Sequence, residues 1–202
     1  MLLPVALSVE NRAVLLVGGG AVAARKATAF LEAGALVTVV SPQLQPDFPA
    51  VHHRAKRYET ADLDGFSLVC ACTAAREVNA QVAADAKARN IWCNIADAPA
   101  ESDFHTSSVI RRGEIAVGVS TSGISPVLAR FVRQKVEASL PQSLEILLEM
   151  TRSYDIPTEI RGDFWRHLLD SKMLPLIENG ELEAARALLE NLLDSLIPER
   201  GE

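Results

Sequence analysis

The stretch Ala13–Ala23, which reads AVLLVGGGAVA, decides the fold of this chain. Its first five residues are an unbroken apolar run, typical of a strand that is buried on both faces of a parallel sheet. Gly18, Gly20 and Ala23 then match the pattern G-x-G-x-x-G/A. In that pattern the glycines permit a tight turn and let the backbone approach a pyrophosphate. The stretch therefore predicts a dinucleotide-binding turn between a strand and a helix.

Outward from this turn, apolar runs and helical periodicity alternate along the chain. Apolar residues at helical spacing predict helices over residues 22–33 and 77–89. Leu3–Leu7 is a further candidate for a strand, at the sheet edge. The alternation predicts an α/β fold with a Rossmann-type parallel sheet and right-handed crossovers. The other predicted strands are Leu36–Val40, Leu68–Thr73, Ile91–Ile95 and Ile115–Ser120.

Residues 42–65 interrupt this alternation, since they contain three prolines and few apolar runs. We expect a loop with a short strand there. The basic run at residues 52–57, HHRAKR, is interpreted as a solvated connection rather than a binding patch.

From Ser125 onward the pattern is helical. Ser125 is a favourable N-cap and Pro126 a favourable first helical residue. Charge changes as well, because residues 1–135 carry 14 basic and 12 acidic residues, whereas residues 136–202 carry 6 and 14. We predict a Rossmann domain over residues 1–112, a dimerisation and substrate segment over 113–142, and a small C-terminal helical domain over 143–202. The predicted helices are Pro126–Val136, Ser143–Thr151, Asp163–Leu169 and Leu182–Leu196.

Composition excludes several classes of protein. With 49% hydrophobic and 23% charged residues, the chain has the composition of a globular domain rather than of a disordered one. No apolar run reaches the ~20 residues of a membrane span, and the first residues lack the basic start of a signal peptide. The acidic C-terminal part is unsuited to nucleic acid. Three cysteines, an odd number, favour reduced thiols in a cytoplasmic protein, and no metal site is expected.

Polar residues follow the predicted strands, where the crevice of an open parallel sheet lies. Asp97 comes just after the strand at residues 91–95 and is suited to proton abstraction, unless it only terminates a turn before Pro99. The second strand ends in Ser41-Pro42-Gln43, without the acidic residue that binds a ribose and without an arginine for a 2′-phosphate. We expect NAD as the cofactor. Thr73, at the end of the third strand, is placed in the cofactor site.

Three strings carry a resemblance to a known family: LLVGGGAVAARKATAFLEAGALVTVVSP, CNIADAP and VSTSGISPVLARFVRQKVE. The chain resembles the precorrin-2 dehydrogenases, including the amino-terminal module of siroheme synthase. This resemblance implies NAD-dependent removal of two hydrogens from precorrin-2, which gives sirohydrochlorin. Asp97 matches the family aspartate implicated in dehydrogenation, and the family's cofactor contacts carry over to Ala21, Val22, Pro42 and Gln43. The chain stops where a methyltransferase domain would begin, which suggests a stand-alone enzyme.

The resemblance also implies partners. The substrate is a tetrapyrrole rich in carboxylates, which needs hydroxyl, amide and cationic donors. Ser120, Ser122, Ser125 and Arg130 are the candidate substrate contacts. Relatives are homodimers joined through their central segments, so we expect a homodimer.

Two alternatives remain open at this point. One is a bifunctional protein that also inserts iron into sirohydrochlorin, because the same aspartate is invoked for both steps. The other is a module that senses NAD without catalysis. His105 is interpreted as structural, and it becomes the candidate base if Asp97 proves dispensable.

Overall fold

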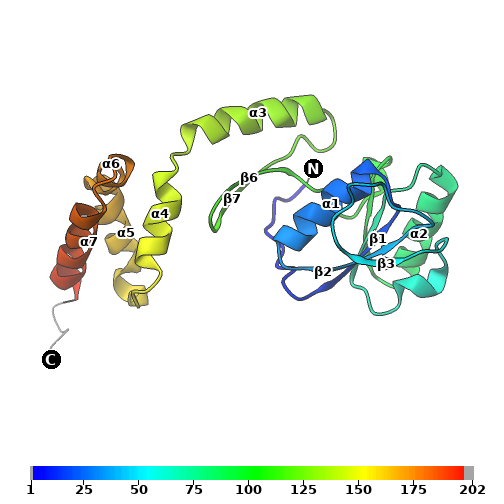
Figure 1. The fold of residues 1–202 in the computed structure, drawn as a ribbon, viewed down its shortest axis with the longest axis horizontal. Helices are drawn as coiled ribbons and strands as arrows, with labels where there is room; N and C mark the ends of the chain where they lie inside the picture. Colours follow the sequence, from blue (N-terminus) through cyan, green and yellow to red (C-terminus); the bar gives the residue numbers. More distant parts are fainter. Residues whose placement is uncertain (1, 198–202) are drawn as a thin grey trace. The chain divides into compact units, whose positions relative to one another are not determined.

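The computed structural model describes residues 2–197 and separates them into two units (Figure 1). The first comprises residues 2–106 and 120–125, and the second comprises residues 107–119 and 126–197. The limits predicted at residues 112 and 142 mark functional parts of the chain and stay predictions. None of the helices in the described residues is long and apolar enough to cross a membrane.

A five-stranded parallel sheet forms the centre of the first unit, which confirms the predicted fold class. The strand order 3-2-1-4-5 is the Rossmann order, and it reverses direction between β1 and β4. Ligands of such sheets bind outside the carboxyl ends of the strands at this point. In spatial order the strands are β3 (His52–Arg54), β2 (Leu36–Val40), β1 (Ala13–Val17), β4 (Leu68–Ala71) and β5 (Trp92–Ile95), and the covering helices are α1 (Ala21–Glu32) and α2 (Arg76–Ala88).

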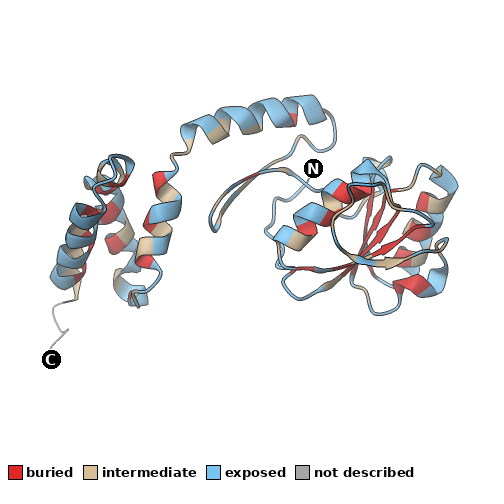
Figure 2. Cartoon of the chain, viewed as in Figure 1, coloured by how far each residue is buried: buried red, intermediate tan, exposed pale blue. Residues whose placement is uncertain are grey.

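Two apolar cores cover the two faces of this sheet. Side chains alternate along β1, so that Val14 and Leu16 pack in the core with α1. Leu15 and Val17 pack in the core with α2. Strands β1, β2, β4 and β5 are accordingly buried along most of their length, as the red colour in Figure 2 shows, whereas β3 has no buried residue. A strand covered on both faces is apolar at every position, which explains why the run before the glycines is unbroken.

The turn between β1 and α1 is built on glycines that leave little room for side chains. Gly18 has a φ of +123°, and a Cβ there would lie 2.5 Å from the carbonyl oxygen of Cys72. A Cβ on Gly19 would lie 1.9 Å from the carbonyl oxygen of Gln43. A Cβ on Gly20, in contrast, would meet no atom of the described residues within 4 Å. The turn is therefore closed by backbone at two positions and open at the third.

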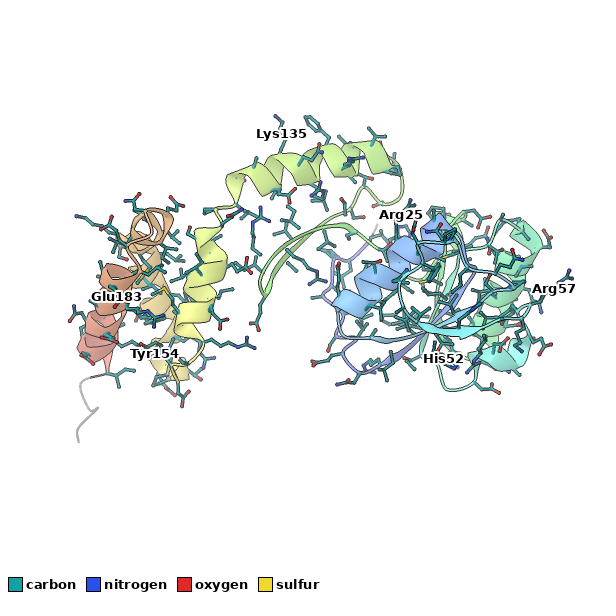
Figure 3. The ribbon with its side chains drawn as sticks, viewed as in Figure 1. Arg25, His52, Arg57, Lys135, Tyr154 and Glu183 are labelled. Atoms are coloured by element: carbon teal, nitrogen blue, oxygen red, sulfur yellow. The ribbon has the colours of Figure 1, made fainter. Side chains whose placement is uncertain are left out.

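The basic run at residues 52–57 is only in part the solvated connection that the sequence predicted. Its first three residues form β3, whose first residue, His52, is labelled in Figure 3, and this confirms the short strand expected before residue 65. Arg54 Nη1 lies 3.2 Å from Asp62 Oδ1, and Lys56 Nζ lies 3.2 Å from Asp62 Oδ2. The Asp62 side chain is only 4% exposed. A buried carboxylate needs partners. Arg54 and Lys56 therefore stabilise the charge of Asp62 beside β3, the edge strand of the sheet.

The prediction of a parallel strand over Ile115–Ser120 is wrong. In the second unit, β7 (Ile115–Val119) pairs antiparallel with β6 (Ser108–Arg112). Only residues 113 and 114 separate the paired strands, and parallel strands need a far longer connection. A short apolar run in the sequence is compatible with a buried parallel strand and with a strand of a hairpin. In the structure β7 alternates between half-buried and exposed positions, as a hairpin strand does. The remaining strand of the parallel sheet is β3 instead.

The prediction of an edge strand at Leu3–Leu7 is also wrong, because these residues are exposed and form no strand. Side chains of the loop after β5 satisfy backbone groups of that edge strand instead. The backbone N–H of Cys93 donates to Asp103 Oδ2, and that of Ile95 donates to Ser102 Oγ. Edge groups that are satisfied in this way need no further strand.

Helices make up most of the second unit. Its C-terminal part has a core of its own, in which Phe164 and Leu168 are fully buried. The short helix α6 was not predicted because Pro175 looks like a helix breaker. Pro175 is the third residue of that helix, where its missing N–H has no intrahelical partner to lose. The helices are α3 (Pro126–Ser139), α4 (Ser143–Thr151), α5 (Thr158–Asp170), α6 (Met173–Glu178) and α7 (Leu182–Leu196).

We expect Gly19→Ala to lower the free energy of unfolding by about 1–3 kcal/mol, because its Cβ would overlap backbone that must move. Gly20→Ala, at an open helix N-cap, should change it by less than about 1 kcal/mol. Urea unfolding of both variants beside the wild type measures the difference. Equal effects at the two positions would contradict the packing of the turn.

Candidate active site

Loops from four parallel strands meet at one edge of the first unit. Parallel strands run in the same direction, so their carboxyl ends lie at the same edge of the sheet. This edge carries the glycine turn after β1, Ser41 after β2, Thr73 after β4 and Asp97 after β5. Residues predicted from separate parts of the sequence thus lie at the carboxyl ends of neighbouring strands.

The loop after β2 is fastened to the glycine turn. Ser41 is buried, and its hydroxyl donates to the carbonyl oxygen of Gln43 at 2.7 Å. The backbone N–H of Gln45 donates to the carbonyl oxygen of Gly19 at 2.8 Å. Pro42 and Gln43 are exposed. Ser41 therefore shapes the loop, whereas Pro42 and Gln43 offer their surfaces to a ligand.

The start of α1 fits a pyrophosphate. Ala21 and Val22 are exposed there, and the first turn contains no acidic residue. The first backbone N–H groups of a helix have no intrahelical partner and bind anions well. Gly20 leaves open space in front of them. The chain thus offers the cradle that a dinucleotide cofactor needs.

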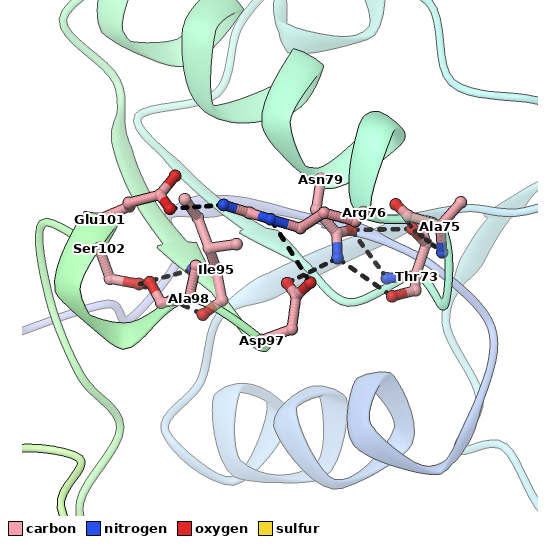
Figure 4. A network of polar contacts seen from close by, with 9 residues as sticks. All are labelled: Thr73, Ala75, Arg76, Asn79, Ile95, Asp97, Ala98, Glu101 and Ser102. Carbon is pink, nitrogen blue, oxygen red and sulfur yellow. Dashed lines mark hydrogen bonds and ion pairs between the residues drawn. The ribbon is translucent and has the colours of Figure 1, made fainter.

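Asp97 lies at the centre of a polar network that Figure 4 shows. Its Oδ1 accepts a hydrogen bond from Asn79 Nδ2 at 2.9 Å, and its Oδ2 lies 3.9 Å from Arg76 Nε. Arg76 also forms an ion pair with Glu101. The Asp97 side chain is 43% exposed. The carboxylate is therefore held by the protein and still open to a ligand and to water.

Thr73 is bound to the same asparagine. Its backbone N–H donates to Asn79 Oδ1 at 3.1 Å, and its hydroxyl shares its one proton between Asn79 Oδ1 at 2.8 Å and the carbonyl oxygen of Ala75 at 3.0 Å. Asn79 Nδ2 donates in turn to the carbonyl oxygen of Thr73 at 3.1 Å. One side chain of α2 therefore connects the turns that follow β4 and β5.

The loop that carries Asp97 is closed at its base. Ser102 Oγ accepts from the backbone N–H of Ile95 at 2.8 Å and lies 3.2 Å from the carbonyl oxygen of Ala98, to which it donates. The backbone N–H of Asp103 donates to the carbonyl oxygen of Cys93 at 2.8 Å. These bonds limit the movement of residues 96–101.

His105 has a structural partner. Its Nε2 lies 2.9 Å from the carbonyl oxygen of Pro99, which fixes this nitrogen as the donor. A Cβ on Gly123 would lie 2.9 Å from Pro99 Cβ, so residues 120–125 pack against the same proline. Two candidate substrate contacts, Ser120 and Ser122, are exposed in this segment. Ser125 is half-buried at its end, and Arg130 lies on α3 in the second unit.

The three cysteines are free and buried. Burial raises the pKa of the Cys70 thiol, and it raises the pKa of Cys72 to about 11 and that of Cys93 to about 12. Such thiols are poor nucleophiles near neutral pH. Within residues 2–197 no group of three or more His, Cys, Asp or Glu side chains is arranged to hold a metal ion.

The sequence did not reveal three parts of this site. Gly19 lies at a variable position of the motif, yet it makes the closest backbone approach of the turn. Arg76 and Asn79 lie on α2 without a motif around them. Their only sequence signal is their place on the helix that follows a strand of the sheet.

Comparison with known proteins shows that the chain is similar to part of several siroheme synthases. It is 38% identical over 205 residues to the siroheme synthase of Thioalkalivibrio sulfidiphilus, covering 95% of this chain and 42% of that protein. It is 40% identical over 212 residues to siroheme synthase 2 of Aeromonas hydrophila, covering 99% of this chain and 45% of that protein. The chain thus spans less than half the length of these relatives. The similarity extends over nearly the whole of this chain, and it confirms the predicted resemblance to the amino-terminal part of siroheme synthase.

A solved structure, that of "SirC, precorrin-2 dehydrogenase", has the same fold. It matches with a TM-score of 0.76 over 96% of this chain and 100% of that chain, at 19% sequence identity. The model of a family described as "Putative NAD(P)-binding" matches residues 5–108, more than half of the chain and most of the first unit. The glycine turn, the exposed start of α1 and Asp97 all lie within these residues, and the chain belongs to this NAD(P)-binding family.

Proposed function

We propose that this protein removes two hydrogens from precorrin-2, with NAD as the hydride acceptor, and so forms sirohydrochlorin. The observation that carries the proposal is the common edge on which the open glycine turn and Asp97 lie. Similarity to siroheme synthases over nearly the whole chain, and the fold shared with a protein named precorrin-2 dehydrogenase, support this substrate.

In this proposal the cofactor site is made of the loops after β1, β2 and β4. When bound, NAD supplies an acceptor for the hydride. Its pyrophosphate is held at the start of α1, and its adenosine lies along the loop after β2. We assign NAD rather than NADP because the end of β2 carries no cation for a 2′-phosphate. The residues assigned to this site are Gly18, Gly20, Ala21, Val22, Pro42, Gln43 and Thr73, together with Ser41, which shapes the loop after β2.

Asp97 acts as the general base in this proposal. The substrate loses a hydride to the cofactor and a proton to the Asp97 carboxylate, so the two lost hydrogens are both accounted for. The partial exposure of Asp97 lets that proton pass to water afterwards. A positioned general base contributes about 10²–10⁴-fold to a rate.

The substrate contacts are proposed from the loop beside Pro99. The hydroxyl groups of Ser120 and Ser122 and the polar groups of Ser125 suit the carboxylates of a tetrapyrrole. Arg130 is proposed as a cationic contact from the second unit.

We also propose a homodimer formed through the central segment. On α3, Val127 is 80% and Phe131 is 55% exposed. Lys135, labelled in Figure 3, has its ammonium group 5.7 Å from the centre of the Phe131 ring. A second copy that covers this helix would remove apolar surface from water.

A direct assay tests the proposed reaction. The purified protein is mixed with precorrin-2 and NAD, or with NADP in a parallel sample. We expect NADH to form in equal amounts with sirohydrochlorin, and NADP to be used more slowly. Binding of NAD without NADH formation would refute the enzyme and favour an NAD-sensing module.

Gly20→Asp should abolish NAD binding while the fold survives, because open space surrounds the position but a carboxylate would repel the pyrophosphate. Calorimetry with NAD measures the affinity, and thermal unfolding shows that the fold is kept. An unchanged affinity would disprove the assignment of the glycine turn.

Asp97→Asn should still fold and bind NAD, but its turnover should fall by roughly 10²–10⁴-fold, because the amide cannot take the proton. The control is His105→Ala, which removes only a bond to the Pro99 carbonyl and should have a much smaller effect. Turnover is measured as NADH production at saturating NAD. Near-normal turnover of Asp97→Asn would make His105 the leading candidate for the base.

Phe131→Glu should convert the dimer to a monomer, because it places a charge on the exposed apolar face of α3. Ser139→Glu, which adds the same charge at the exposed end of that helix, is the control and should remain dimeric. Sedimentation velocity distinguishes the two states. A monomeric wild-type protein, or a dimeric Phe131→Glu variant, would contradict this interface.

A further inference from the structure

Asn79 is a fully buried side chain whose hydrogen-bonding positions are all occupied. Its Oδ1 accepts two hydrogen bonds from Thr73, and its Nδ2 donates one to the Thr73 carbonyl oxygen and one to Asp97 Oδ1. The orientation of the amide is set by these partners, because a backbone N–H only donates whereas a carbonyl and a carboxylate only accept. Asn79 therefore holds Asp97 by a donor that cannot be exchanged for its oxygen.

The packing of α2 does not by itself call for an amide at this position. The other buried side chains of the helix, Val82 and Ala86, are apolar. Burying an amide costs free energy unless all its hydrogen bonds are made. An apolar residue could fill this place on α2 without that requirement. The amide is thus better explained by the two turns that it joins.

The second contact of Asp97 is a weaker restraint. Arg76 Nε lies 3.9 Å from Asp97 Oδ2, both side chains are nearly half exposed, and Arg76 is shared with Glu101. Exposed ion pairs of this kind contribute little. The 2.9 Å bond from the buried Asn79 is the shorter and better shielded contact.

We propose that Asn79 is a positioning residue that fixes the Asp97 carboxylate relative to the Thr73 turn. This inference rests on the proposed dehydrogenation, in which Thr73 belongs to the cofactor site and Asp97 takes the proton. Because one amide binds both turns, the Asp97 carboxylate keeps a fixed position relative to the Thr73 turn of the cofactor site. A displaced base loses much of its rate advantage, up to about 10²-fold for an error near 1 Å.

Other titratable groups around Asp97 bear on the pH dependence. In the described part of the chain these are Arg76, Glu101 through its pair with Arg76, and the thiol of Cys72, whose own neighbour is Lys26. None of them changes when Asn79 is replaced, so they serve as a constant background in the test.

The experiment uses Asn79→Asp, which keeps an oxygen for the Thr73 donors and replaces the amide donor to Asp97 by a second carboxyl group. Two carboxyl groups then share one site, and the acid limb of the kcat profile should move to higher pH by about one unit or more. The affinity for NAD should stay near that of the wild type. Gln81→Glu, an exposed amide-to-acid change on the same helix, is the matched control and should leave the profile unchanged.

A double-mutant cycle gives a second reading without an added charge, and it also serves if Asn79→Asp fails to fold. Asn79→Ala should lower kcat by about 10- to 100-fold in the wild type. In the Asp97→Asn background it should add little, because the group that it positions is already lost. Additive effects in the two backgrounds would overturn the proposal.

The positioning role can also be separated from the proposed reaction. The Asp97 carboxyl carbon is titrated by NMR in the protein alone, with Asp97→Asn identifying its signal. A titration displaced to higher pH in Asn79→Asp supports the contact even if precorrin-2 is not turned over. An unchanged titration would overturn it, whatever the outcome of the assay.

Discussion

The structure depends on a close approach of backbone to backbone at the carboxyl end of β1. Carbonyl oxygens of Cys72 and Gln43 occupy the space that side chains at positions 18 and 19 would need. Only glycines allow the loops after β2 and β4 to close around the turn in this way. The start of α1, in contrast, remains open in front of Gly20. The same constraint thus sets both the packing of the sheet edge and the place for a pyrophosphate.

Thr73 and Asp97 follow β4 and β5, which lie on the other side of the point where the strand order reverses. Asp97 follows the edge strand β5, where a loop would be mobile without support. Ser102 and Asp103 satisfy the backbone of β5 and close the base of this loop, and Asn79 holds the carboxylate from α2. The Asp97 carboxylate is therefore placed by hydrogen bonds from two segments, residues 102–103 and helix α2, both of which lie in the first unit.

The sequence predicted those parts of the fold that rest on local patterns. The unbroken run of β1, the glycine turn and the helix after it are confirmed, because burial on both faces and a tight turn constrain the residues directly. The hairpin of β6 and β7 was missed because its apolar run resembles a buried strand. Helix α6 was missed because a proline in a first helical turn resembles a break. Asn79 was missed for a different reason: its role depends on a contact 18 residues away, which no local pattern encodes.

We propose that the glycine turn and Asp97 serve one bound cofactor. A crystal structure of the protein with NAD tests it most directly. We expect the pyrophosphate at Gly20 on the start of α1, with the nicotinamide ring beside Thr73 and facing Asp97. A nicotinamide ring directed away from Asp97, or a pyrophosphate bound elsewhere than at Gly20, would contradict it.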